Sequence, residues 1–171
     1  MAATVQVSSP FLRFGLAVAL ATLIADQAHK WWMLAVYRIQ ERGRVTLTPF
    51  LDLVYVKNLG ISYGLLPQQG DLAQWLLSGF ALLSALALTW WLAKGTGGRL
   101  WALSVGLIIG GALGNAIDRL HLGGVADFFS LHAFGFYWYV FNIADVAIVA
   151  GVIGLLYDSI WTSRNGASNA V

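Results

Sequence analysis

Long runs of apolar residues, separated by short polar connections, dominate this chain. A helix needs about 20 mostly apolar residues to cross the hydrocarbon of a bilayer, and four stretches approach or reach that length. The second of them contains no charged residue. We therefore predict one all-α integral membrane domain over 1–171, with four transmembrane helices at about 11–32, 72–93, 100–118 and 136–157.

The connection between the first two predicted helices has a different pattern. From Val45 to Lys57 it is rich in β-branched and aromatic residues, and it contains Pro49, which is typical of short strands joined by a turn. We predict a small extracytoplasmic β element over about 45–66, lying at the membrane surface. The tail over 162–171 is predicted to be loose.

Composition supports a membrane protein and excludes several kinds of site. Only 11% of the residues are charged, whereas soluble domains carry roughly 25%. The absence of cysteine excludes disulfides and thiol catalysis. The three histidines have no metal-binding spacing, so we predict no metal. A net charge of +2 with dispersed basic residues does not favour a nucleic-acid partner.

Charge bias does not determine the orientation in the membrane. Four spans place both termini on one side, where four basic residues lie, and four more lie on the opposite side. Adding Lys30 and Arg119 to the second group makes that side the more basic one. Basic residues normally mark the cytoplasmic side, so the count does not favour cytoplasmic termini.

The third predicted helix carries Gly106, Gly110 and Gly114 at four-residue spacing. Small residues in such a row allow another helix to approach backbone to backbone. The fourth helix has small residues at the same spacing, such as Ala147 and Gly151. We predict that these two helices pack closely together.

Polar residues beside the apolar runs are the candidates for function, because an Asp at the bilayer centre costs about 2.5–3.5 kcal/mol. Asp26 and Lys30 stand four residues apart, so they share a helix face and can form a structural ion pair. Asn58, followed by Gly60, indicates either a plain turn or a loop that approaches a substrate closely.

A third cluster lies at the end of the third predicted helix. Asn115 precedes Asp118 and Arg119 by about one turn, so an amide and two charges gather there. Adjacent residues on a helix do not face each other, so both charged residues need partners elsewhere. This cluster suits a scaffold around a site better than the chemistry itself.

Two further carboxylates complete the set. Asp127 follows the third helix, and Asp145 lies in the fourth, one turn beyond Asn142 and next to the apolar residues 146–149. Two carboxylates that share one proton can act as acid and base at one point, as in aspartic proteases. Alternatively, Asp127 is a turn or capping residue and Asp145 a buried hydrogen-bonded anchor, and the residues alone leave both interpretations open.

Taken in order, these clusters resemble the sequence blocks of the bacterial lipoprotein signal peptidases, or signal peptidase II. The resemblance runs from Asp26 to Asp145 through Asp-Gln-x-x-Lys, Asn-x-Gly, Gly-Asn-x-x-Asp-Arg, Val-x-Asp-Phe and Phe-Asn-x-Ala-Asp. Each block is weak alone, and five in order over four predicted spans are specific. One departure is Ala126, which is smaller than the residue expected there and bears on local packing.

The resemblance implies a membrane aspartic endopeptidase with Asp127 and Asp145 as its catalytic pair and no metal or other cofactor. It implies a multi-pass protein of the bacterial inner membrane, with both termini cytoplasmic and the site toward the outer leaflet. The substrate would be a prolipoprotein with a diacylglyceryl-modified cysteine, cut just before that cysteine. We expect membrane lipids as partners and a monomeric enzyme. The residues implied to shape the site or bind substrate are Asn58, Gly60, Asn115, Asp118, Arg119 and Asn142.

Two other functions could use the same residues. A small proton-coupled transporter or channel subunit also carries intramembrane Asp, Asn and Arg, but it predicts carboxylates spread through the membrane depth. A purely structural protein would use its charges only to hold helices together. The Gly-x-Ser-x-Gly at 60–64 lies in the predicted surface β element and not at a turn from a buried strand into a helix, so it does not support a serine protease. A zinc protease lacks support because no His-Glu-x-x-His appears.

Overall fold

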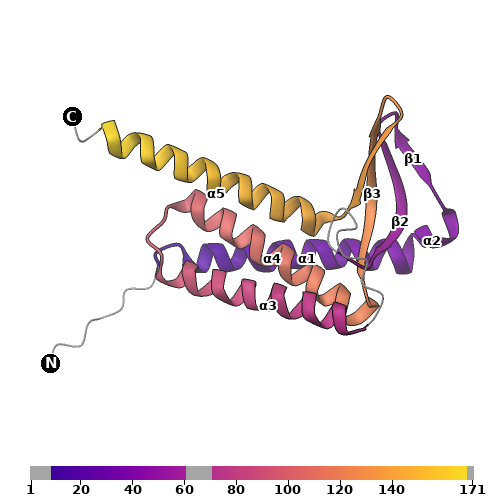
Figure 1. Ribbon diagram of the computed structural model, residues 1–171, viewed down its shortest axis with the longest axis horizontal. Coiled ribbons are helices and arrows are strands. Elements are labelled where there is room, and N and C mark those ends of the chain that lie inside the picture. The colour runs from indigo at the N-terminus through magenta and orange to yellow at the C-terminus, as the bar shows by residue number, and fades with distance from the viewer. Residues whose placement is uncertain (1–8, 61–70, 169–171) are drawn as a thin grey trace.

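The computed structural model describes residues 9–60 and 71–168, which form a helical bundle with a small sheet at one end (Figure 1). The elements in chain order are α1 (Leu12–Trp31), the π-helical turn η1 (Trp32–Val36), α2 (Ile39–Arg42), β1 (Val45–Thr48), β2 (Leu51–Asn58), α3 (Asp71–Lys94), α4 (Arg99–Leu122), β3 (Val125–Ala133), β4 (Phe136–Phe141) and α5 (Ile143–Ser168).

Three of the described helices are long and apolar enough to cross a membrane. These stretches are Leu72–Lys94, Arg99–Leu122 and Ile143–Ser163. Helix α1 has a similar length of 20 residues, but it also contains Asp26 and Lys30, which are both buried. The described residues therefore form the mostly helical membrane fold with a small sheet that the sequence predicts.

Helix α4 is the centre of the bundle, and it packs against α1, α3 and α5. Its glycine row does not face α5, as the sequence analysis predicted, but α1. A Cβ at Gly106 would collide with the backbone oxygen of Gly15, and a Cβ at Gly110 with that of Ala19. Gly114 likewise faces the carboxyl group of Asp26. The row therefore brings α1 close enough for its polar end to reach α4.

The close contact between α4 and α5 is nevertheless present, through other small residues. A Cβ at Gly111 would lie 2.5 Å from the backbone oxygen of Ala144, and one at Gly151 would lie 2.6 Å from that of Ser104. Gly111 lies one residue beyond the predicted row, about 100° further around the helix. Glycines on two faces thus let α4 contact two helices at backbone distance.

The sheet has four antiparallel strands in the order β1-β2-β3-β4. Strand β3 pairs Phe129 with Leu53 and Asp127 with Val56 of β2, so β2 contains one extra residue between these two pairs. Such a bulge changes which residues of a strand share a face. The sheet's inner side packs on η1 and α2 through a buried cluster of Met33, Ile39, Leu53, Ala126 and Phe128.

Several predicted boundaries were wrong. The predicted β element contains β1 and β2, while its residues 61–66 lie outside the described part. The sheet also takes two strands from the connection between α4 and α5. Residues 136–141 form β4 rather than the start of a helix, because this segment consists of aromatic residues and one β-branched residue, which suit a strand. Helix α4 continues to Leu122, and α5 continues to Ser168 through most of the predicted loose tail.

A buried carboxylate holds β1, β2 and β3 together away from the bundle. Asp52 is 3% exposed, and its Oδ2 lies 2.7 Å from Arg44 Nη1 and 3.3 Å from His132 Nε2. The hydrogen bond from Arg44 lowers the pKa of Asp52 below its ordinary value. Tyr137 of β4 stacks on His132, which extends the contact to the fourth strand.

The glycine contact between α1 and α4 can be tested with one added methyl group. We expect Gly106→Ala to destabilise the protein by about 1–3 kcal/mol, because the new Cβ meets backbone that cannot rotate away. The measurement is the midpoint of thermal unfolding in detergent, which should fall by about 2–4 °C for each kcal/mol.

Gly79→Ala in α3 is the matched control, since a Cβ there has open space around it. It should be neutral or slightly stabilising, because alanine favours a helix over glycine by up to about 1 kcal/mol. Equal melting temperatures for the two variants would contradict the close approach at Gly106.

Candidate active site

Asp127 lies in β3, where the strand is buried on both faces. Its side chain is 1% exposed, and its neighbours Ala126 and Phe128 are fully buried. Two side-chain amides donate to its carboxylate: Asn142 Nδ2 lies 2.6 Å from Oδ1, and Asn58 Nδ2 lies 3.2 Å from Oδ2. Asp127 is therefore a strand residue held by hydrogen bonds, and not the turn or capping residue of the alternative interpretation.

Asp145 lies in the first turn of α5, and its side chain is half-buried. The backbone N–H of Asp145 donates to Asn142 Oδ1 at 3.0 Å, and the backbone N–H of Asn142 donates to Asp145 Oδ2 at 3.2 Å. This reciprocal pair is a capping box, which satisfies two N–H groups at the start of a helix. Asn142 thus explains why α5 begins where it does.

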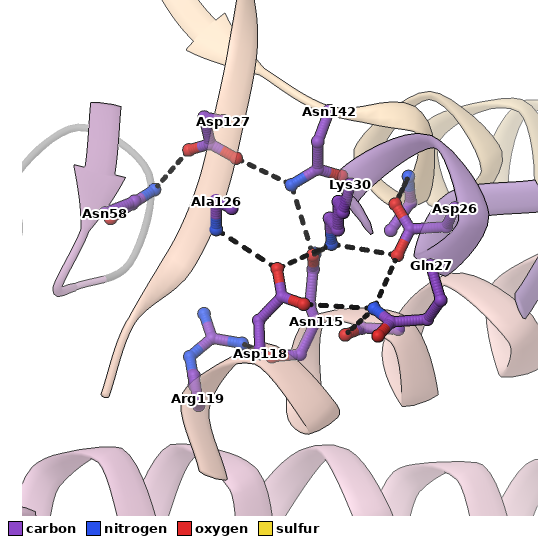
Figure 2. Close-up of polar contacts among 12 residues, drawn as sticks. Asp26, Gln27, Lys30, Asn58, Asn115, Asp118, Arg119, Ala126, Asp127 and Asn142 are labelled. Carbon is purple, nitrogen blue, oxygen red and sulfur yellow. Dashed lines mark hydrogen bonds and ion pairs between the residues drawn. The ribbon is translucent and has the colours of Figure 1, made fainter. Parts of the chain in front are cut away.

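Two asparagine side chains connect the two carboxylates. Asn115 Nδ2 donates to Asp145 Oδ1 at 2.8 Å. Asn142 Nδ2 donates to Asn115 Oδ1 at 3.2 Å as well as to Asp127. A continuous chain of amides therefore joins Asp127 to Asp145 through residues of α4 and the start of α5, and Figure 2 shows the part from Asn58 to Asn115.

A buried ion cluster lies behind this chain. Lys30 is 3% exposed, and its Nζ lies 2.8 Å from Asp26 Oδ2, 2.8 Å from Asp118 Oδ2 and 3.2 Å from Asn115 Oδ1 (Figure 2). The predicted pair of Asp26 and Lys30 is present, and Asp118 supplies the second carboxylate. One cation is thus shared by two carboxylates from α1 and α4.

The same two carboxylates also hold the backbone beside each candidate catalytic residue. Asp118 Oδ2 accepts from the N–H of Ala126 at 3.1 Å, and Ala126 directly precedes Asp127. Asp26 Oδ1 accepts from the N–H of Ala144 at 3.0 Å, and Ala144 directly precedes Asp145. The cluster therefore fixes the backbone next to Asp127 and Asp145, and with it the positions of their side chains.

Gln27 is a member of this cluster to which the sequence analysis gave no role. Its Nε2 lies 3.0 Å from Asp118 Oδ1, 3.2 Å from Asp26 Oδ2 and 3.2 Å from the backbone oxygen of Gly114. The sequence offers one indication of this role, because Gln27 is an amide that lies between the charged residues Asp26 and Lys30 of the same helix. The backbone N–H groups of Ala126 and Ala144 have no sequence signal, because any residue supplies one.

Both carboxylates line one cavity of about 1210 Å³. Asn58, Gly60, Asn115 and Arg119 also line it, whereas Asp26, Lys30, Asp118 and Asn142 lie behind its wall. Gly60 donates its N–H to Asn58 Oδ1 at 3.1 Å, which fixes that amide next to Asp127. Arg119 donates to the backbone oxygen of Asn115 at 3.3 Å. All ten residues singled out from the sequence thus gather at or behind this cavity.

The environment of Asp127 favours its protonated form. Burial, and after it the negative charge of Asp145, raise the pKa of Asp127 to about 7 against the opposing hydrogen bonds from Asn142 and Asn58. A carboxyl group with that pKa can donate or accept a proton near neutral pH. Among the described residues, no group of three or more acidic or histidine side chains could hold a metal ion.

Comparisons with known proteins identify the family to which this chain is similar. The family model for signal peptidase (SPase) II matches residues 18–161. The lipoprotein signal peptidase of Methylobacterium sp. (strain 4-46) is 52% identical over 155 residues, 91% of this chain and 93% of that protein. The one from Methylocella silvestris is 51% identical over 154 residues, 90% of each chain. A solved bacterial membrane enzyme is similar with a TM-score of 0.79 and 26% identity, covering 92% of this chain and 94% of its own.

The raised pKa of Asp127 predicts a pH-dependent loss of stability. Between about pH 4 and 7 the unfolded chain releases this proton while the folded protein retains it, so the free energy of unfolding decreases as the pH rises. Asp127→Asn stays neutral and lacks this decrease. Relative to wild type, its unfolding free energy should rise from pH 4 to 8 by up to roughly 4 kcal/mol, measured from thermal unfolding in detergent.

Asp52→Asn is the control with the opposite sign. The lowered pKa of Asp52 contributes stability at neutral pH that is lost in acid, as the pH falls through its folded value. Asp52→Asn should therefore be less stable than wild type at pH 7, with the difference shrinking toward acid. A difference between Asp127→Asn and wild type that does not change with pH would contradict the assignment of the proton to Asp127.

Proposed function

Since this chain belongs to the signal peptidase II family of membrane aspartic endopeptidases, we propose that Asp127 and Asp145 are its catalytic pair. The enzyme removes signal peptides from prolipoproteins. The observation that carries the assignment is that these two carboxylates line the same cavity and are joined by Asn115 and Asn142.

The two carboxylates divide the work of acid and base. Asp127, whose pKa is raised to about 7, holds the shared proton and donates it to the oxygen of the scissile carbonyl. Asp145 takes a proton from a water molecule, whose oxygen attacks the carbonyl carbon. The resulting tetrahedral diol collapses as Asp145 gives its proton to the leaving nitrogen, the C–N bond breaks, and a diol hydroxyl returns a proton to Asp127. Asn142 forms hydrogen bonds with both acidic residues, so it holds their positions relative to each other during this exchange.

The same cavity has an apolar side suited to a signal peptide. Beyond the carboxylates, its wall is formed by Phe80 of α3, Ile108 and Ala112 of α4, and Val149 and Ile153 of α5. Signal peptides contain an apolar segment of 7–15 residues. We place that segment along this wall, with the scissile bond at the carboxylates. Holding the substrate in a fixed direction supplies much of the orientation that catalysis needs.

The substrate carries a diacylglyceryl group on the cysteine that follows the cut. Acyl chains that remain in the bilayer hold the scissile bond near the headgroups, where water is available. The sheet, whose strands β2 and β3 carry Asn58 and Asp127, lies at one end of the bundle, whereas α1 starts and α5 ends at the opposite end (Figure 1). With α1 as a fourth span, both termini are cytoplasmic and the carboxylates face the outer leaflet of the inner membrane.

The proposed function is expected of a monomer, and it differs from that of a transporter in where its carboxylates lie. A proton-coupled transporter would need carboxylates at several depths. Asp26, Asp118, Asp127 and Asp145 instead belong to one hydrogen-bonded network at one end of the bundle. This grouping supports a surface-facing hydrolase.

We expect Asp127→Asn and Asp145→Asn to reduce cleavage by about 10²–10⁴-fold or more, because each removes an acid or base from the reaction. Purified protein is incubated in detergent with a diacylglyceryl-modified peptide and its unmodified twin, and the cleaved fraction is measured over time. Asp158→Asn on α5, which lies outside the cavity lining, should cleave at the wild-type rate. Wild-type cleavage by either catalytic variant would refute the pair, and equal cleavage of both peptides would refute the lipid requirement.

The rate should also depend on pH in a bell-shaped manner. Cleavage requires one proton on the pair, so it should decline above about pH 7, where the proton held by Asp127 is lost, and again in acid, where both groups are protonated. The measurement is kcat/KM with the modified peptide from about pH 4 to 9. A flat profile through the acid range would indicate another mechanism.

A further inference from the structure

A second, smaller cavity adjoins the catalytic one where β2 ends and α3 begins. It has a volume of about 460 Å³ and lies against the last turn of α4. Arg119 and Lys57 line both cavities, so the two spaces are neighbours. The residues that line the smaller cavity are Lys57, Gln74, Trp75, Arg119, Leu120, His121, Leu122 and Gly123.

The lining of this cavity is basic. Among the side chains that the structure describes, it contains Lys57, Arg119 and His121, which we call the basic pocket, and no acidic residue. Arg119 lines the catalytic cavity together with Asp145 and Asp127, whose negative charge attracts its guanidinium. Lys57 forms no ion pair with any described residue, and its side chain is exposed. One positive charge in the pocket therefore lacks a counterion within the described part of the chain.

The end of α4 does not account for this charge. The carbonyl groups at a helix C-terminus carry about half an elementary negative charge in total. Lys57 alone exceeds that value, and His121, in the last turn, adds to the positive side when it is protonated. A net positive potential thus remains, which favours an anion.

Two buried polar atoms in the lining also lack partners. Gln74 is 5% exposed; its Nε2 donates to the backbone oxygen of Leu59 at 2.6 Å, while its Oε1 accepts no hydrogen bond. Arg119 Nε is buried and donates none. A buried polar atom without a hydrogen-bond partner is unfavourable. A ligand that fills the pocket would need an acceptor for Arg119 and a hydroxyl donor for Gln74.

The position of the pocket in the bundle indicates where this ligand comes from. The pocket lies between the start of α3 and the end of α4, two of the helices long and apolar enough to span the membrane. Trp75 lines it and is 63% exposed, as is typical of tryptophan at the level of lipid headgroups. Basic pockets between membrane helices on the cytoplasmic side bind anionic headgroups, and the same attraction between charges acts on a headgroup of the outer leaflet.

We propose that the basic pocket binds the phosphodiester of an anionic phospholipid whose headgroup carries free hydroxyls, such as phosphatidylglycerol. The phosphate oxygens accept from Lys57 and Arg119, and a headgroup hydroxyl donates to Gln74 Oε1. The lipid then sits beside the catalytic cavity and fixes Arg119, which lines both. Binding is independent of the assignment of Asp127 and Asp145, because it is measured without cleavage.

The test measures thermal unfolding of the full-length protein in neutral detergent mixed with phosphatidylglycerol or with phosphatidylcholine at equal mole fraction. Phosphatidylglycerol should raise the Tm by about 2–4 °C more than phosphatidylcholine, since a ligand that binds only the folded state stabilises it. The variant Lys57→Gln/His121→Gln should lose this extra rise. Both positions are exposed, so the double variant is expected to fold.

Two controls separate a specific site from general charge. Lys57→Arg keeps the positive charge and should keep the rise, and Lys94→Gln removes a charge at the other end of α3 and should also keep it. An equal Tm in both lipids, or a full rise in the double variant, would overturn the proposal. A third arm adds inorganic phosphate without phosphatidylglycerol: an equal rise there would overturn the lipid as ligand in favour of a soluble anion, and no rise would support the lipid.

Discussion

The buried ammonium group of Lys30 is the constraint on which the rest of the site depends. An ion pair away from water is stable only if every charge has a partner, and removal of one partner typically costs 3–5 kcal/mol. Here Asp26 and Asp118 both contact Lys30, and each uses its other interactions to bind backbone that leads directly into Asp145 or Asp127. The contacts that hold the helices together are therefore the same contacts that position Asp127 and Asp145.

Glycine makes this cluster possible. Three charged side chains can share one dry space only if the helices that carry them are close together, and the glycines on two faces of α4 provide that closeness toward α1 and α5. Bulkier residues would separate the backbones, and water would enter between the charges. The close packing of the helices and the buried ion cluster thus both depend on the small side chains of α4.

Much of the site could be predicted from the sequence, because a charge or amide beside an apolar run has few explanations in a membrane protein. The fold was harder. The composition of residues 136–141 is compatible with the end of a membrane helix and with a strand. The segment forms a strand because it pairs with β3. The partner of the glycine row depends on helix rotation, which spacing alone does not give. The capping role of Asn142 required knowing where α5 begins.

The extra residue in β2 determines the chemical neighbourhood of Asp127. Residues directly opposite in antiparallel strands share a face, and so do residues two apart in one strand. With the bulge, Asp127 pairs with Val56, and the amide of Asn58 comes onto its side of the sheet. Continuing the register from Leu53 and Phe129 without the bulge would bring Lys57 there instead. An ammonium group would then stabilise the ionised acid and favour loss of its proton. The bulge, by taking the extra residue of β2 out of the ladder, therefore gives Asp127 a neutral amide as its neighbour in place of a cation.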